Sequence, residues 1–264
     1  MRRTHRLAVL VSLCAITPAA PATAPAHLAP MQAAPMGAPF AVGERSEYDV
    51  KYGVIRAGRS ALEVTGIDTV RGRDAYRFQF QIVGGVRFIY SIRDTMWSWV
   101  DTATFESLRF IQDNQEGGRN RYRHYEIFPE RGVYLERGQE ETATVPNPLD
   151  DLSFLYFVRT RELEVGREYS FPQYFKPPAN PVTLRVLRKE RVKVPAGTFD
   201  AIVVQPSFKT RGIFSEGGQA QVWISDDSAR VIVKVTTKIA VASLSLELRS
   251  YRPGTRPGAA PPRD

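Results

Sequence analysis

Apolar and polar residues alternate along most of this chain with the two-residue period of half-buried β-strands. The pattern is clearest at Tyr76, Phe78, Phe80 and Ile82, which are separated by polar or small residues. Similar runs, divided by turn residues, cover 48–54, 62–70, 108–115, 119–128, 133–136, 182–194, 199–205, 219–225, 231–235 and 244–248. The chain therefore predicts a mainly β fold of about a dozen antiparallel strands.

Two places need a local feature beyond alternation. Ala57-Gly58 is expected to turn the first strand into the second. Phe88, Tyr90 and Ile92 share one parity, whereas Trp97 and Trp99 share the other. This change of parity predicts a bulge or bend near residues 94–96.

Residues 147–160 (NPLDDLSFLYFVRT) have the pattern of a helix. Asn147 is expected to be the N-cap and Pro148 the first helical residue, with Asp150 and Asp151 at the positive end of the helix dipole. Residues 152–158 are apolar almost all round the helix, so protein must cover most of its surface. At about 20 Å the helix is too short to span a bilayer. We expect a large curved antiparallel sheet, or open half-barrel, around one central helix.

The N-terminal segment predicts export. A basic start, a short apolar run and small residues make residues 1–26 a signal peptide. We expect 27–39 to be an Ala/Pro-rich tether, 40–251 a single β-rich domain and 252–264 a disordered tail. The location is expected to be the periplasm. No lipid anchor is expected at Cys14, because Leu13 stands where a lipobox needs a small residue.

Charge and cysteine content limit the partners and the chemistry that this chain can have. The formal charge is +8, of which three units come from arginines in residues 1–26. The remaining excess suits acidic lipid head groups or glycans, although simple solubility is the preferred explanation. The single cysteine lies in the signal peptide, so the exported chain has no disulfide and no cysteine nucleophile.

No complete catalytic set is present in the sequence. His124 is the one histidine of the predicted domain, and no Gly-x-Ser-x-Gly motif accompanies it. One histidine without cysteine is a poor zinc set. The Asp226-Asp227 pair is interpreted as a turn, and Asp150-Asp151 as helix N-terminal charge. We therefore expect neither an enzyme nor a metal or other cofactor.

Aromatic and basic residues offer binding surfaces but no defined site. Trp97, Trp99 and Trp223 could line an apolar or glycan-binding groove, or could simply fill the sheet. Alternation places in solvent a set of cations that might form a basic patch: Arg119, Arg121, Arg123, Lys189, Arg191 and Lys193. Export makes nucleic acid an unsuitable partner. The sequence leaves the ligand-binding residues unidentified.

Four segments together resemble a bacterial exported family labelled domain of unknown function 3108. They are residues 43–58 (GERSEYDVKYGVIRAG), the helix with NPLDDL and FVRT, residues 194–200 (VPAGTFD) and residues 222–227 (VWISDD). The resemblance implies export and a β-rich fold, and it implies no catalytic residues. The chain departs from the family pattern at Arg230-Val231, where the family has an Arg-Pro-like step. A sheet curled round a helix is also similar in shape to the half-barrels of periplasmic lipoprotein carriers.

The leading functional hypothesis is a non-enzymatic cell-envelope protein that binds an apolar or amphipathic ligand, or a partner, between sheet and helix. Possible partners are a lipid, a glycan or an envelope protein, with no transmembrane segment after signal removal. One alternative is a structural or assembly factor that uses exposed sheet edges. The other is a hydrolase that depends on His124.

Overall fold

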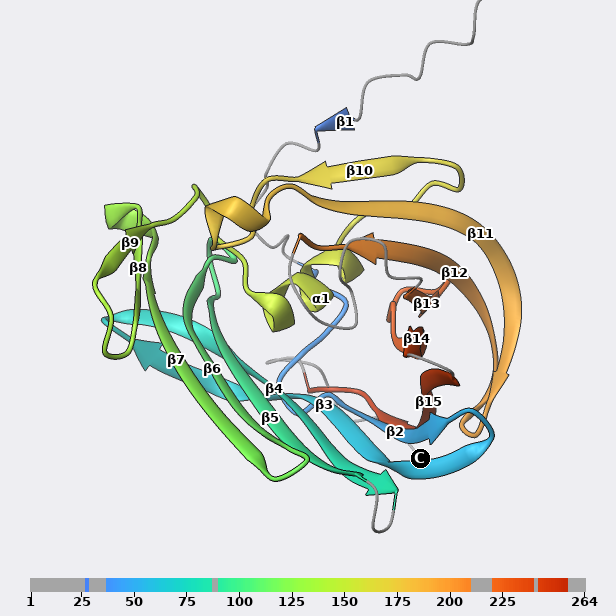
Figure 1. The fold of residues 1–264 in the computed structure, drawn as a ribbon. Helices are drawn as coiled ribbons and strands as arrows, with labels where there is room; N and C mark the ends of the chain where they lie inside the picture. The colour runs from blue at the N-terminus through green and yellow to red at the C-terminus, as the bar shows by residue number, and fades with distance from the viewer. Residues whose placement is uncertain (1–26, 29–36, 87–89, 210–219, 240–241, 256–264) are drawn as a thin grey trace, which may run out of the picture.

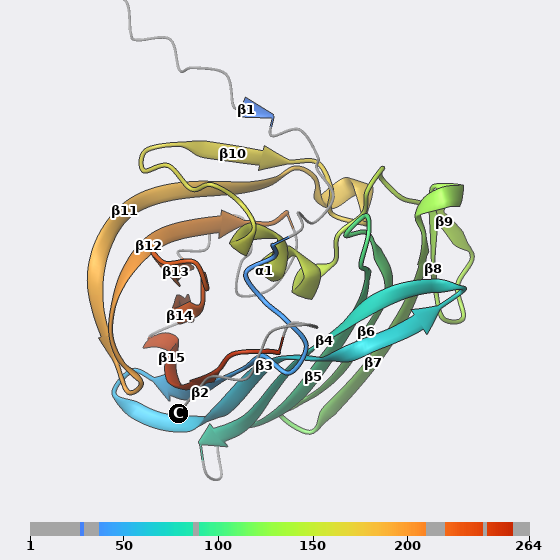
Figure 2. The same ribbon diagram turned by 180° about the vertical axis from the view of Figure 1, so that it is seen from behind.

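In the computed structural model, one curved sheet wraps around a single helix (Figures 1 and 2). The structure describes residues 27–28, 37–86, 90–209, 220–239 and 242–255. Within them the sheet has 15 strands, and all pairings are antiparallel except that of β1 with β10. The strands are β1 (His27–Leu28), β2 (Arg45–Tyr52), β3 (Ile55–Val70), β4 (Arg73–Val86), β5 (Tyr90–Asp101), β6 (Ser107–Glu116), β7 (Arg119–Phe128), β8 (Val133–Glu136), β9 (Glu141–Ala143), β10 (Glu168–Phe171), β11 (Val182–Val194), β12 (Gly197–Ser207), β13 (Gln221–Ser225), β14 (Ile232–Ile239) and β15 (Ala242–Arg252).

The strand order follows the chain almost everywhere. From β2 the sheet extends strand by strand to β9, and from β10 it extends to β15. The two runs are joined by the antiparallel pairing of β15 with β2. Among the described residues, β9 and β10 are not paired with each other, so the barrel stays open where the helix connects them. The predicted open barrel of antiparallel strands around one helix is confirmed, with a few more strands than expected.

The helix α1 (Asp151–Arg159) begins later than the sequence predicts. Asp150 is the N-cap, and its carboxylate accepts the backbone N–H groups of Leu152 and Ser153, each at 2.9 Å. Asn147 instead has a left-handed φ of 55°, and Leu149 forms an isolated parallel bridge with Tyr174. The prediction of Asn147 as N-cap was wrong because the pairing of Leu149 with residues 173–175 holds residues 147–149, which we call the strap, outside the helix.

The core lies between α1 and the concave face of the sheet. Tyr156 stacks on Phe78 of β4 with ring centroids 3.8 Å apart. Phe154 contacts Phe171 and Phe208, which belong to the opposite half of the sheet. The helix therefore joins the two runs of strands through buried aromatic contacts, each contributing beyond simple area burial.

A buried ion pair fixes the C-terminal end of the helix. Arg159 donates to both carboxylate oxygens of Glu44, at 2.7 and 3.0 Å, and both side chains are almost fully buried. The same guanidinium donates to the carbonyls of Pro39, Ala229 and Arg230. One side chain thus connects the helix, the start of the described domain and the turn before β14.

Two local predictions from the sequence are corrected. The first hairpin turns at Gly53-Val54, and Ala57-Gly58 lies inside β3, because β2 and β3 stay paired down to Tyr52 and Ile55. Gly58 faces Gly84 of β4 at a very close approach: a Cβ added at Gly58 would lie 2.3 Å from the Val83 carbonyl oxygen. No bulge occurs at 94–96, since β4 and β5 pair without a register shift.

Several predictions fall outside the described residues. They concern the signal peptide with Cys14, residues 29–36 of the predicted tether and residues 256–264 of the predicted tail. Of the tether, His27–Leu28 form β1 beside β10, and the Pro39 carbonyl accepts a hydrogen bond from Arg159. At the other terminus, the N–H of Thr255 donates to the Val42 carbonyl at 2.9 Å.

Candidate functional site

The register of β4 to β7 decides which side chains face the helix. Ser98 of β5 donates to the Asp150 carboxylate at 2.6 Å, so Ser98 and the residues alternating with it are on the concave face. Trp97 and Trp99 therefore face outward. Residues paired across neighbouring strands lie on the same face of a sheet. Ser98 pairs with Phe110 of β6, and Phe110 pairs with Tyr125 of β7, so both aromatic residues are also on the concave face.

On the concave face, three neighbouring cross-strand rows change from apolar to charged. Each row starts at an apolar residue or glycine of β4 and ends at an arginine of β7. We call these rows the concave site; they are Phe80–Met96–Gln112–Arg123, Ile82–Asp94–Asn114–Arg121 and Gly84–Ile92–Glu116–Arg119. Phe80, Ile92 and Met96 pack against the core yet remain partly exposed, so the apolar end of the site presents accessible surface.

Asp94 occupies the middle row and is 7% exposed. Its carboxylate accepts the backbone N–H of Gln115 at 2.9 Å and the side-chain amide of Asn114 at 3.2 Å. Burial, reinforced by the neighbouring Glu116 carboxylate, raises the pKa of Asp94 to about 7. The concave site therefore carries less negative charge at neutral pH than its sequence suggests.

Two of the three arginines that end the concave site have no acidic partner among the described residues. Arg119 and Arg121 are exposed, and neither forms an ion pair with any described residue. Arg123 lies 3.7 Å from Glu136 and donates to the Tyr125 hydroxyl at 3.3 Å. Lys176 donates to the same hydroxyl at 2.8 Å, and burial, with the Arg123 charge, lowers its pKa. This end of the site is suited to an anionic group.

On the convex face, the described side chains form a groove of about 410 Å³ around Trp97 and Trp99. The indole N–H of Trp99 donates to Asp68 at 2.8 Å, and Asp68 also binds the Arg77 guanidinium at 3.0 Å. The groove is lined by Thr65, Arg77, Gln79, Trp97, Trp99, Ile111, Asp113 and Tyr122. Trp223, in contrast, is 6% exposed and donates to Glu190 at 2.6 Å, so the three tryptophans do not form one groove.

His124 faces outward in an ion-pair network. Its Nε2 lies 2.9 Å from the Glu126 carboxylate, which also binds Arg109 and Arg71. Because the acid that would orient the imidazole is neutralised by two guanidinium groups, the surroundings are those of a structural ion pair.

The carboxylates singled out in the sequence have structural partners. Asp227 accepts from the Ser225 hydroxyl and from the backbone N–H groups of Ala229 and Arg230, as a turn residue does. Asp226 pairs with Lys189 at 2.7 Å. Both therefore belong to the turn between β13 and β14, as predicted.

Asp150 and Asp151 are at the helix start, as predicted. Burial raises the pKa of Asp150 in spite of its hydrogen bond from Ser98. Burial, with the Asp150 charge, raises the pKa of Asp151 to about 6, and Tyr174 donates to its carboxylate at 3.2 Å. The capping bonds satisfy Asp150, so this pair anchors the helix.

The six basic residues considered together in the sequence do not behave alike. Lys189 and Arg191 are both on β11. Lys189 forms an ion pair with Asp226, and Arg191 forms one with Asp200. The arginines of β7 lie on the concave face, opposite His124, as their parity predicts. Alternation identified the shared face, but the curvature of the sheet decides that this face is the inner one.

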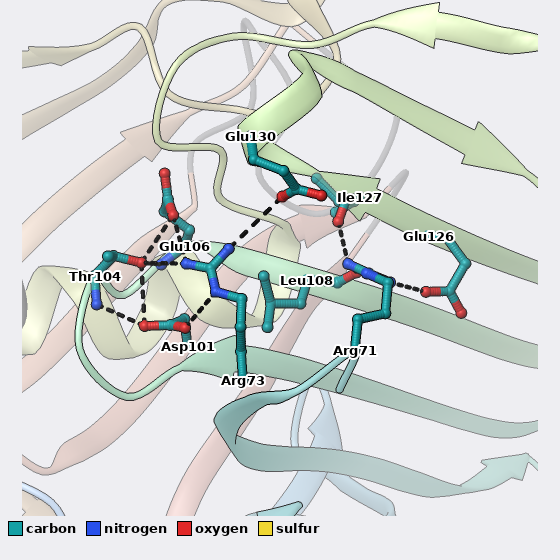
Figure 3. Close-up of polar contacts among 9 residues, drawn as sticks. All are labelled: Arg71, Arg73, Asp101, Thr104, Glu106, Leu108, Glu126, Ile127 and Glu130. Atoms are coloured by element: carbon teal, nitrogen blue, oxygen red, sulfur yellow. Dashed lines mark hydrogen bonds and ion pairs between the residues drawn. The ribbon is translucent and has the colours of Figure 1, made fainter. Parts of the chain in front are cut away.

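A dense polar cluster joins the β3–β4 turn to the ends of β5 and β7 (Figure 3). Arg73 donates to Asp101 at 2.7 Å and to Glu106 at 2.9 Å, while Arg71 binds Glu126 and the Leu108 carbonyl. Although burial works against it, backbone N–H groups of the following loop and Arg73 hold the pKa of Asp101 below its usual range. All these charges are paired, so the cluster stabilises the turn.

The sequence analysis did not identify Asp94 of the concave site or the neighbouring Lys176. Asp94 stands in an apolar strand, and a polar residue on the inward parity of such a strand is the signal that could have identified it. Lys176 lies in a proline-rich loop whose position depends on the pairing of β10 and β11. In the described residues no group of histidine, cysteine and carboxylate side chains could hold a metal ion, and no helix is long and apolar enough to cross a membrane.

Comparison with known proteins gives a family and a fold. The family model for a protein of unknown function (DUF3108) matches residues 47–249. A β-barrel-like protein of domain of unknown function DUF1849 from Brucella abortus has a similar structure, with a TM-score of 0.53 and 11% identity over 82% of this chain and 99% of that chain. No curated protein matches the sequence.

Two further solved structures are similar to this chain at lower TM-scores. A protein from Parabacteroides distasonis, provisionally classed as a lipoprotein, has a TM-score of 0.36 and 12% identity over 81% of this chain and 98% of that chain. The hypothetical protein CT021 from Chlamydia trachomatis has a TM-score of 0.34 and 8% identity over 84% and 93%. Of these three structures, the one from Brucella abortus has a TM-score above 0.5 and supports a shared fold.

Proposed function

The chain belongs to the DUF3108 family of proteins of unknown function, and from the geometry of its concave site we propose that it is an exported, non-enzymatic binding protein for an amphipathic ligand with an anionic head. The observation that carries the proposal is the gradient across the concave site. Apolar, partly exposed residues of β4 and β5 are followed by unpaired arginines of β7 on the same face.

The gradient matches the two ends of such a ligand. An alkyl or other apolar group would cover Phe80, Ile92 and Met96, at about 25 cal/mol for each Å² removed from water. A carboxylate or phosphate head would be bound by Arg119 and Arg121, which form no ion pair with a described acid. Protonation of Asp94, whose pKa burial raises to about 7, reduces repulsion of that head.

Export supports this function, since a hydrophobic signal-like start precedes the domain in the sequence. The absence of an enzymatic role is part of the same proposal. His124 has a neutralised acid for a neighbour and lies on the face opposite to the concave site.

The test uses dansyl-labelled undecanoic acid and its uncharged methyl ester as fluorescent probes. The purified domain should bind the acid more tightly than the ester. The double change Arg119→Gln and Arg121→Gln should weaken binding of the acid by about tenfold, which corresponds to about 1.4 kcal/mol, and leave the ester unchanged. Lys193→Gln, an exposed cation of β11 with no described partner, is the matched control.

Two results would contradict the proposal. If neither probe binds, the proposed apolar ligand contact is wrong. If the double variant binds the acid as tightly as the unchanged protein does, and neither protein prefers the acid to the ester, the proposed anion contact is wrong. A melting temperature close to that of the unchanged protein would show that the variants remain folded.

The assembly factor remains the second candidate, because β9 is an unpaired strand edge among the described residues. The edge is short, and Glu141 on it binds Arg131, features that oppose strand addition. Crosslinking in cells to one abundant envelope protein, together with failure of probe binding, would favour this candidate.

A further inference from the structure

The convex groove has a composition that the amphipathic ligand does not explain. It lies on the opposite side of β5 from the concave site, because Trp97 and Met96 are adjacent residues of one strand. Gln79, Trp97 and Ile111 form one cross-strand row of the groove, and Asp113 and Tyr122 are paired in the next. The groove therefore presents flat aromatic surfaces beside polar groups.

Several polar groups of the groove are available for a ligand. The Gln79 amide, the Trp97 indole N–H, the Asp113 carboxylate and the Tyr122 hydroxyl make no hydrogen bond with any described residue. Tyr122 is 53% exposed. Donors and acceptors are thus both present among the side chains that line the groove.

We propose that the convex groove is a binding site for a neutral saccharide. The face of a sugar ring carries C–H groups that pack on an indole, and its edge carries hydroxyl groups that both donate and accept hydrogen bonds. Trp97 supplies the packing surface, because the Trp99 ring already has the Arg109 guanidinium 5.5 Å from its centre. Gln79, Asp113 and Tyr122 supply the complementary polar groups.

The charges of the groove favour a neutral sugar over an acidic one. The Arg77 guanidinium is bound to Asp68 and to the Thr65 hydroxyl, so its charge is already offset. Asp113 has no cationic partner among the described residues. An acidic sugar would therefore meet an unbalanced carboxylate.

The size of the groove favours a small ligand over a protein. Its volume of about 410 Å³ lies within the usual range for small-molecule sites, about 300–1,000 Å³. A stable protein interface uses about 20–30 residues on each side. The eight residues that line the groove are too few for such an interface.

The test is calorimetric titration of the domain with linear neutral oligosaccharides: chitotetraose, cellotetraose, maltotetraose and laminaritetraose, with tetragalacturonate as the acidic comparison. At least one neutral sugar should bind, and tetragalacturonate should not. Trp97→Ala should weaken that binding by about tenfold or more, the effect of removing a central contact. Tyr122→Ala, which changes an exposed side chain and leaves the core intact, should weaken it by about threefold.

Matched controls separate this site from other surfaces and from the concave site. Val83→Ala changes an exposed apolar residue of β4 outside the groove and should leave saccharide binding unchanged. The double change Arg119→Gln and Arg121→Gln should also leave it unchanged, so the two proposals can fail separately. The inference would be overturned if no neutral sugar binds, or if both Trp97→Ala and Tyr122→Ala leave the affinity unchanged. Binding of a protein, and not of a sugar, that depends on Trp97 would also overturn it.

Discussion

At the scale of single residues, Asp94 is the group whose chemistry the fold changes most. An aspartate in an unfolded chain has a pKa of about 3.9. In the folded protein burial raises the pKa of Asp94 to about 7. Between these values the native state holds a proton that the unfolded state has lost, so the free energy of unfolding falls as pH rises from about 4 to about 7.

The change Asp94→Asn should flatten this pH dependence. The variant keeps the acceptor for the Gln115 N–H but cannot ionise, so it should gain stability over the unchanged protein by up to a few kcal/mol at pH 7 and little at pH 4. Urea unfolding at several pH values measures the difference. Asp151, with a pKa of about 6, contributes in the same direction to both proteins and cancels in the comparison. Parallel stability profiles for the two proteins would show that Asp94 does not hold a native-state proton.

The pair Glu44–Arg159 should be the most sensitive charge pair to disrupt. Glu44→Ala leaves a guanidinium buried without its carboxylate, and such a loss costs about 3–5 kcal/mol. Denaturant unfolding should show this loss. Asp200→Ala breaks the exposed pair with Arg191 and should leave stability almost unchanged, because solvent screens this pair. A loss at Glu44 no greater than that at Asp200 would mean that the buried pair does not fix the helix end.

At the scale of elements, α1 is a core helix whose faces are unequal. Leu152 and Tyr156 are fully buried, whereas Leu155 is half-buried. Leu152→Ala should therefore cost about 2–5 kcal/mol through lost burial and a residual cavity, and Leu155→Ala should cost less. Thermal melts of the two variants measure the order.

The control for this comparison is Glu162→Ala, an exposed residue just after the helix. Arg161 is a poorer control, because its guanidinium lies 4.2 Å from the Phe157 ring centre. Equal melting temperatures for Leu152→Ala and Glu162→Ala would identify α1 as a mobile lid, which belongs to the low-stability part of a fold.

At the scale of the whole molecule, the closing of the chain onto itself at β15 and β2 is the main topological feature. Thr255 bonds to Val42, so the two ends of the described domain are neighbours. A circular permutant that joins residue 255 to residue 38 and opens at the Gly117-Gly118 turn should fold, since exposed turns tolerate new termini. A cooperative thermal transition within several degrees of the original would confirm this.

A second permutant, opened between Asp150 and Asp151, tests the role of the helix strap. It separates the N-cap from the helix and breaks the capping box, so it should fold poorly or not at all. If both permutants melt alike, the helix start is not an anchor of the barrel.

The sequence by itself determined the local features of this protein. Alternation at Tyr76, Phe78, Phe80 and Ile82 predicted a strand, and the uninterrupted apolar run after Leu152 predicted a covered helix. Parity placed the arginines of β7 on the face opposite His124. These features are decided by neighbours in the chain, because side-chain direction in a strand has a period of two residues.

The tertiary structure alone decided which face is concave, where the helix begins and what Asp94 contacts. Each depends on contacts between distant residues: the Tyr48 hydroxyl donates to the Ile232 carbonyl, 184 residues away, and the strap before α1 is held by its bridge to Tyr174. The convex groove likewise requires β3 to β7 to be paired in register, so that Thr65 and Tyr122 line the same groove. Local pattern cannot encode the curvature of a sheet, because curvature results from the pairing and packing of all its strands.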